Sequence, residues 1–168
     1  MSRQLWLGML WLLGASVAPA QVKTPAQETA FAPRPITLRG GETIVNAAWE
    51  RERQTGRRPD CSHLVHAIYI RAGFPYTYLR SSDLYRGADE FQRVTDPQPG
   101  DLVVWKGHVG IVVYPAQRIF FSAMRSGLGI DSYDAPYWKR RGHPYFYRYM
   151  KPNGLSQPTL VLTDQHQQ

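Results

Sequence analysis

The sequence predicts an α+β domain in which helices come first and an antiparallel β-sheet follows. Helical periodicity lies between about residues 43 and 72, whereas short runs of β-branched and aromatic residues, separated by turn residues, occupy the second half of the chain. Helices followed by strands, without regular alternation, are typical of α+β architecture. The length of 168 residues fits one domain with a single core, and no internal repeat indicates a second one.

The first twenty residues are predicted to be an export signal. Arg3 supplies a positive start, residues 5–17 are uninterrupted apolar sequence, and Ala18-Pro19-Ala20 has the small-x-small pattern of a signal peptidase site. The apolar stretch is shorter than the roughly 20 residues that a membrane span needs. An uncleaved membrane anchor is the alternative. We therefore expect a signal peptide over residues 1–20, a periplasmic or secreted protein, and no stable membrane insertion after cleavage.

The sequence after the leader indicates a linker followed by a helix. Residues 21–42 are predicted to be the linker, because they contain several prolines and no sustained period. Residues 43–54 then show helical spacing, with charged residues away from the apolar face. The apolar residues that share one face are Ile44, Ala47 and Ala48.

A second helix is predicted to begin at Asp60 or Cys61 and to end near Ala72. Asp60 is a good N-cap residue, and Gly73 stands where a glycine commonly follows a helix. The apolar residues at helical spacing are Leu64, Val65, Ile68 and Ala72. This helix places Cys61 in its first turn.

The remainder of the domain is predicted to be loops and strands. Residues 74–100 are rich in loops, with at most a short helix around residues 82–85. The expected strands cover residues 102–105, 108–114 and 118–123, with weaker candidates at 129–133 and 145–149. Residues 151–168 are polar and aperiodic, which predicts a flexible C-terminal tail. The predicted catalytic domain therefore covers residues 43–150.

The chain is basic, with a formal net charge of +7. This balance favours anionic partners such as nucleic acid, a membrane surface or an acidic wall polymer. The basic residues are scattered except at two short clusters, and no nucleic-acid-binding motif surrounds them. We therefore expect no nucleic-acid partner, and for an exported protein the cell wall is the more natural acidic partner.

Cys61 is the single cysteine of the chain. Exported proteins usually use cysteines in disulfide pairs, so a lone cysteine is either a small buried hydrophobe or a working thiol. A thiol attacks an amide only as its thiolate, which the first turn of a helix favours. The spacing of Cys61, His63 and His66 matches no standard zinc site. We expect no metal and no cofactor.

A cysteine nucleophile needs an imidazole to take its proton, and His108 is the best candidate among five histidines. His63 and His66 lie on the helix of Cys61 at offsets that point away from the thiol. His143 and His166 lie in segments expected at the surface. His108 opens a strongly apolar strand, so it should lie at the end of the sheet, where the Cys61 helix can meet it.

Five segments, in order along the chain, resemble the NlpC/P60 family of cysteine peptidases. They are Asp60-Cys61-Ser62-His63-Leu64-Val65, Leu79-Arg80-Ser81-Ser82, Pro99-Gly100-Asp101-Leu102-Val103, Gly107-His108-Val109-Gly110-Ile111 and Ala135-Pro136-Tyr137-Trp138-Lys139-Arg140-Arg141. The resemblance covers about residues 43–150. It implies a papain-like fold, with N-terminal helices packed on an antiparallel β-sheet, and hydrolysis of peptide bonds in peptidoglycan stem peptides, typically next to D-glutamate or diaminopimelate.

The same resemblance implies the roles of individual residues. Cys61 would be the nucleophile of an endopeptidase and His108 its base. Asp60 caps the helix and, by resemblance, also meets the free amine of a stem peptide. The remaining substrate-binding positions are Ser62, Arg80 and Ser81. We expect a monomer.

Three departures from the family pattern matter for function. The family's tyrosine upstream of the cysteine is missing from residues 49–56, and His63 stands where a glycine is usual. The family often orients the catalytic imidazole with a second histidine, and Ser122 occupies that position here. Its hydroxyl can accept a hydrogen bond from the ring. Asp131 or a water molecule is the alternative orienting group.

Two other functions fit the same residues. The missing tyrosine and the serine in the third position are compatible with a catalytically silent wall-binding or regulatory module. A thiol amidase or acyltransferase acting on another substrate, including an effector directed at a competitor's wall, would keep the chemistry of Cys61 and His108 and change the target.

Overall fold

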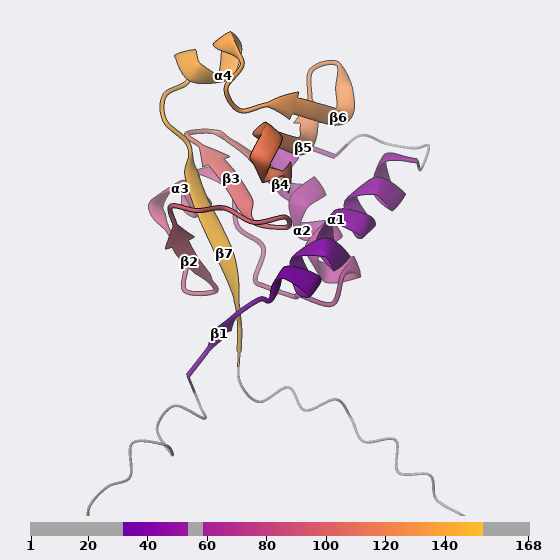
Figure 1. The fold of residues 1–168 in the computed structure, drawn as a ribbon, viewed down its shortest axis with the longest axis vertical. Helices are drawn as coiled ribbons and strands as arrows, with labels where there is room; N and C mark the ends of the chain where they lie inside the picture. Colours follow the sequence, from indigo (N-terminus) through magenta and orange to yellow (C-terminus); the bar gives the residue numbers. More distant parts are fainter. Residues whose placement is uncertain (1–31, 54–58, 153–168) are drawn as a thin grey trace, which may run out of the picture.

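The protein is described here by a computed structural model that covers residues 32–53 and 59–152. Helices precede an antiparallel sheet and pack on it, which confirms the predicted α+β class (Figure 1). The predicted signal peptide, the first half of the predicted linker and nearly all of the predicted tail lie outside the described residues. Within the described part of the chain, no helix combines the length and the apolar character that crossing a membrane requires.

The described residues form one seven-stranded sheet, all of whose pairings are antiparallel. The strand order is β1-β7-β3-β4-β5-β6, and β2 pairs with β7 as well. The strands are β1 (Arg34–Pro35), β2 (Phe91–Val94), β3 (Leu102–Trp105), β4 (His108–Tyr114), β5 (Ile119–Met124), β6 (Gly127–Ser132) and β7 (Tyr145–Lys151). β3 and β4 have the predicted limits, and β5, β6 and β7 differ from prediction by one or two residues at their ends.

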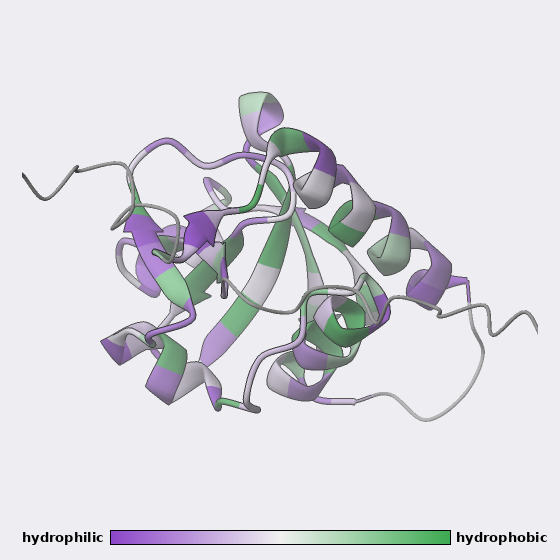
Figure 2. Cartoon of the chain, turned by 90° about the horizontal axis from the view of Figure 1, so that it is seen from below, coloured by the Kyte–Doolittle hydropathy of each residue, from purple (hydrophilic) through white to green (hydrophobic). Residues whose placement is uncertain are grey.

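The helices in the described residues are α1 (Leu38–Glu52), α2 (Cys61–Arg71), α3 (Ser81–Arg86) and α4 (Pro136–Arg140), with a 3₁₀ turn η1 at Pro115–Gln117. α2 and α3 confirm the predicted second helix and the short helix after it. β2 and α4 were not predicted. β2 carries two polar residues among its four and so lacks the unbroken apolar run of β3, and α4, at five residues, is too short to show a helical period. The two long helices lie on one side of the strands (Figure 2).

The first helix begins at Leu38, ahead of the predicted residue 43. Thr37 caps it, because its hydroxyl accepts a hydrogen bond from the Gly40 backbone N–H at 3.3 Å. Gly40 and Gly41 lower the helix propensity of the first turn, so the sequence did not indicate a helix there. Gly41 is required by packing: a Cβ there would lie 1.9 Å from the carbonyl oxygen of Pro99. β1 and this first turn fall within the predicted linker.

The alternation of side chains along β4 divides the apolar interior into two clusters. Val109, Ile111 and Val113 face the helix-side core, which includes residues of α1 and α2. The second cluster, on the other face, contains Val103, Trp105, Val112, Phe120 and Trp138. Since His108 directly precedes Val109, its side chain points to this second face, toward α4.

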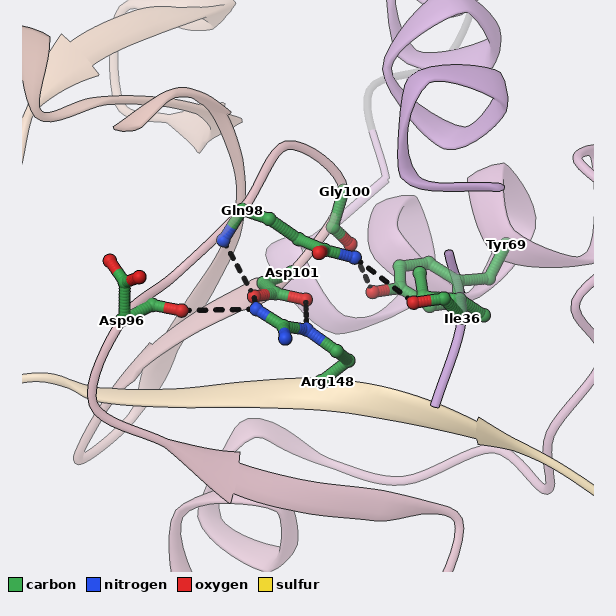
Figure 3. Close-up of polar contacts among 7 residues, drawn as sticks. All are labelled: Ile36, Tyr69, Asp96, Gln98, Gly100, Asp101 and Arg148. Carbon is green, nitrogen blue, oxygen red and sulfur yellow. Dashed lines mark hydrogen bonds and ion pairs between the residues drawn. The ribbon is translucent and has the colours of Figure 1, made fainter. Parts of the chain in front are cut away.

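A buried ion pair fixes the turn that leads into β3 (Figure 3). Asp101 is fully buried, and its carboxylate accepts hydrogen bonds from Arg148 at 3.1 and 2.8 Å and from the Gln98 backbone N–H at 2.8 Å. Beside it, the Tyr69 hydroxyl of α2 donates to the Gly100 carbonyl oxygen at 2.5 Å. These contacts join α2, the turn and β7, and so hold the helix of Cys61 in place against the sheet.

Candidate active site

Cys61 is the first residue of α2 and is half-buried at the edge of the helix-side core. Asp60 caps the helix, since its Oδ1 accepts the His63 backbone N–H at 2.9 Å. The first turn of a helix leaves backbone N–H groups unpaired and carries partial positive charge, both of which favour a thiolate. The predicted position of the thiol in the first turn is therefore confirmed.

Ser122 lies beside His108 on the neighbouring strand β5. The Ser122 hydroxyl is fully buried, and its oxygen lies 3.0 Å from Nε2 of His108 and 2.7 Å from the carbonyl oxygen of Val109. A hydroxyl has one proton, and the carbonyl oxygen can only accept it. Ser122 therefore donates to Val109 and accepts from Nε2–H of His108. The neutral imidazole then carries its lone pair on Nδ1.

The ring of His108 is enclosed by aromatic side chains. Its centroid lies 4.7 Å from that of Trp138 and 6.2 Å from that of Trp105. Burial, with a smaller contribution from the positive charge of Arg141, lowers the pKa of His108 from 6.5 to about 4. His108 is therefore neutral at pH 7, the state in which it can accept a proton.

Cys61 and His108 pack against different clusters of the core. α2 packs against β4 and β5, as the sequence argument required, and Cys61 contacts the helix-side core. The ring of His108 turns to the opposite face, toward Trp138. Across residues 32–53 and 59–152, the imidazole of His108 is hydrogen-bonded to Ser122, and no hydrogen bond joins it to the sulfur of Cys61.

A second polar cluster surrounds the start of α2. The Asp60 carboxylate also contacts Nδ1 of His63 at 2.7 Å, and Tyr78 stacks on the His63 ring with centroids 4.4 Å apart. The Tyr78 hydroxyl lies 3.3 Å from the same Nδ1. Burial opposes ionisation of Asp60, but its hydrogen bonds with His63 outweigh this and hold its pKa below the usual value. Tyr78 was missed by sequence reasoning, because a loop tyrosine gives no signal of what it stacks on.

The other predicted substrate-binding residues lie along the connection between α2 and α3. Ser62 is buried, and its hydroxyl accepts the Ser81 backbone N–H at 3.0 Å, which ties the two helix starts together. Arg80 is exposed at the N-cap of α3, and its backbone N–H donates to Asp83 at 3.2 Å. The structure thus places Asp60, Ser62, Arg80 and Ser81 in one neighbourhood.

Asp131, the alternative orienting group, does not bond to His108 in the described residues. Its carboxylate accepts the indole N–H of Trp138 at 2.7 Å and the Ser132 backbone N–H at 2.7 Å. It positions the indole that covers His108, a role that depends on folding of β6 against α4. No group of three His, Cys, Asp or Glu side chains among the described residues is arranged to hold a metal ion.

Comparisons with known proteins identify the family. The NlpC/P60 family matches residues 48–145, which is more than half of the chain. No curated protein matches. One similar solved structure is NlpC1 from Trichomonas vaginalis, with 18% identity and a TM-score of 0.44, over 67% of this chain and 43% of that one. The chain thus spans less than half the length of that relative. From the match over residues 48–145, we conclude that the chain belongs to the NlpC/P60 family.

Proposed function

We propose that this chain is a cysteine endopeptidase that hydrolyses peptide bonds in peptidoglycan stem peptides, with Cys61 as nucleophile, His108 as base and Ser122 as the group that orients His108. Membership of the NlpC/P60 family supports the broader class, a cell-wall peptidase or a related hydrolase. The hydrogen bonds of Ser122 carry this proposal, because they fix the neutral tautomer of His108 that has its lone pair on Nδ1.

The chemistry follows from that tautomer. Nδ1 takes the proton of the Cys61 thiol, and the thiolate attacks the substrate carbonyl carbon. The backbone N–H of Cys61 contributes to stabilising the oxyanion. His108 then returns the proton to the leaving amine as the C–N bond breaks, which leaves a thioester on Cys61. Water, deprotonated by His108, attacks the thioester, and the released thiolate regains its proton.

The step requires a hydrogen bond between the Cys61 thiol and Nδ1 of His108, which is not present among the described residues. Catalytic hydrogen bonds are often long in unliganded enzymes and tighten when substrate binds. Nδ1 makes no hydrogen bond to any described residue, so nothing in this part of the chain competes with the thiol for its lone pair.

The predicted location belongs to the same proposal. We propose that residues 1–20 direct export and are removed, and that the protein acts in the periplasm or outside the cell. We propose that it acts there as a monomer. The measurement is the N-terminal sequence of protein recovered from the extracytoplasmic fraction. A new N-terminus at Gln21 supports the proposal, and an intact leader on membrane-bound protein would show an anchor instead.

The test of activity is a digest of purified sacculi and of defined muropeptides, analysed by mass spectrometry. We expect new stem-peptide fragments with the wild type and none with Cys61→Ala or His108→Ala. His143→Ala is the matched histidine control, because His143 is exposed and lines a different cavity from His108, and it should retain turnover. Fragments from Cys61→Ala would refute the assigned nucleophile. Sacculus binding without fragments would favour a wall-binding module.

A further inference from the structure

A cavity of about 530 Å³ lies apart from the residues of the proposed chemistry. It is found where the turn between β4 and β5, the β6–α4 connection and the segment between α4 and β7 meet. It shares no lining residue with the cavity that His108 and Arg141 line, and Cys61 is not part of its wall. Its wall includes Arg118, Tyr133, Asp134, Lys139 and Phe146.

Two aromatic rings form an apolar part of this wall. Tyr133 and Phe146 both pack against the second cluster of the core, so the cavity lies on the sheet face away from α1 and α2. Their ring centroids are 5.3 Å apart with the planes inclined at 67°, and the Tyr133 hydroxyl donates to the Pro115 carbonyl oxygen at 3.2 Å. Both rings are half-buried, which leaves part of each open to a ligand. An aromatic wall of this kind can pack against the flat C–H face of a sugar ring.

The polar part of the wall offers donors and acceptors side by side. The Arg118 guanidinium and the Asp134 carboxylate form an ion pair that is partly exposed. A sugar hydroxyl both donates and accepts hydrogen bonds, so an adjacent guanidinium and carboxylate can bind neighbouring hydroxyls together. Asp134 opposes an anionic ligand, and Arg118 with Lys139 opposes a cationic one. The wall therefore favours a neutral carbohydrate over a charged peptide or a phosphate polymer.

Arg118 has a backbone conformation that few residues other than glycine adopt. Its φ is 60°, and across residues 32–53 and 59–152 every other residue with positive φ is a glycine. The left-handed conformation costs free energy in a residue with a Cβ, and such positions cluster at functional sites. Arg118 ends the η1 turn, where glycine would fit without strain. The turn alone does not call for an arginine here, whereas a ligand in the cavity does.

We propose that this cavity binds the carbohydrate strand to which the stem peptides of the wall are attached. The inference rests on the proposed function and adds a second contact with the same polymer, away from the reacting groups. α4 connects the two regions, because Trp138 packs on His108 and the next residue, Lys139, lines the cavity. A strand bound here holds the enzyme on the wall and raises the effective concentration of stem peptides around it.

The first test uses a soluble chito-oligosaccharide, an amino-sugar chain without peptide, titrated into the full chain and followed by calorimetry. We expect saturable binding whose Kd rises about tenfold or more in Arg118→Gly, because a charge-assisted donor is lost. Phe146→Leu keeps an apolar side chain but loses the flat ring, so it should weaken binding as well. Arg140→Gln, exposed on α4 and outside the wall, should bind like the wild type.

The thermal midpoint separates a binding role of Arg118 from a structural one. Arg118→Gly should unfold at or above the wild-type midpoint, because glycine relieves the backbone strain and the lost ion pair is largely exposed. A lower midpoint with unchanged oligosaccharide binding would show that Arg118 only fastens the hairpin, and would overturn the proposal. Failure of the oligosaccharide to bind, or binding of polyphosphate in its place that high salt removes, would overturn it too.

Turnover measurements distinguish failure of this cavity from failure of the peptidase. Arg118→Gly should release fragments from sacculi about tenfold more slowly than the wild type, while both cleave a free stem peptide with the same kcat/KM. Cleavage of sacculi at equal rates, without oligosaccharide binding, would overturn the carbohydrate site and leave the peptidase intact. Oligosaccharide binding that depends on Arg118, without cleavage of any wall substrate, would support the cavity and refute the peptidase.

Discussion

At Ser122, one hydroxyl group determines which ring nitrogen of His108 carries the proton. Its proton goes to Val109, so its oxygen is available only as an acceptor for Nε2–H. In the proposed mechanism a serine adds no charge to the imidazolium, unlike the aspartate of a Ser-His-Asp triad. The role that we propose for Ser122 is therefore to fix the orientation and the tautomer of the buried ring.

Ser122→Ala should lower kcat with little change in KM, because Nε2–H loses its acceptor and the ring is free to adopt the other tautomer. We expect a loss of about tenfold to a hundredfold, the scale of a positioning hydrogen bond that contributes about 1.5–3 kcal/mol. Steady-state kinetics on a defined muropeptide measures it, with the thermal midpoint as a control for folding. An unchanged kcat would assign orientation to Asp131 or to water.

The lowered pKa of His108 predicts how stability depends on pH. Its folded pKa of about 4 lies below the ordinary 6.5, so the unfolded chain binds more protons between these values. Stability should therefore fall as pH decreases from about 6.5 to about 4. His108→Gln, which cannot titrate there, should lose less stability over the same range, by on the order of 3 kcal/mol. Denaturant unfolding at pH 7 and pH 4 measures the difference, and parallel curves for both proteins would contradict it.

At the scale of the element, Asp60 caps α2, and we propose that it also binds substrate. Asp60 holds the first turn through the His63 backbone N–H and presents a negative charge beside Cys61. Asp60→Asn keeps the capping oxygen, so we expect near-wild-type stability but a raised KM for stem peptides with a free amine. Asp60→Ala should lose the cap as well, at a cost of about 1 kcal/mol. Equal KM values for Asp60→Asn and wild type would show that Asp60 only caps the helix.

The elements differ in how far the sequence could predict them. α2 was predictable because its N-cap, apolar face and final glycine are local features. β3 and β4 were predictable as unbroken apolar runs between turn residues. The start of α1 was not, since its glycines serve a contact with Pro99 that only the folded chain creates.

The residues of the candidate site also differ in how far the sequence could predict their positions. Ser122 beside His108 could be anticipated from the family resemblance, and the structure places it there. The stacking of Tyr78 on His63 and the position of Arg141 in the cavity beside His108 could not, because both join segments that are distant in sequence. Long-range packing sets these contacts, and no periodicity or short motif records it.

At the scale of the whole molecule, the site depends on how α2 is held against the sheet. The thiol comes from a helix and the imidazole from a strand, so their separation is set by packing between layers. The buried pair of Asp101 and Arg148 fixes the turn before β3, and Tyr69 joins that turn to α2. A change in this network should therefore affect both folding and the placement of Cys61.

Asp101→Asn should destabilise the fold by about 3 kcal/mol, because it removes one charge of a buried pair and leaves Arg148 without its partner. Glu50→Gln is the matched control, since the Arg71–Glu50 pair has a similar distance of 2.9 Å but is about half exposed. Exposed pairs contribute about 0–1 kcal/mol, so this control should unfold near the wild-type midpoint. Urea denaturation compares the three proteins. If Asp101→Asn lost no more stability than Glu50→Gln, the turn would be held by its backbone hydrogen bonds and by Tyr69, and the ion pair would not be what secures α2 against the sheet.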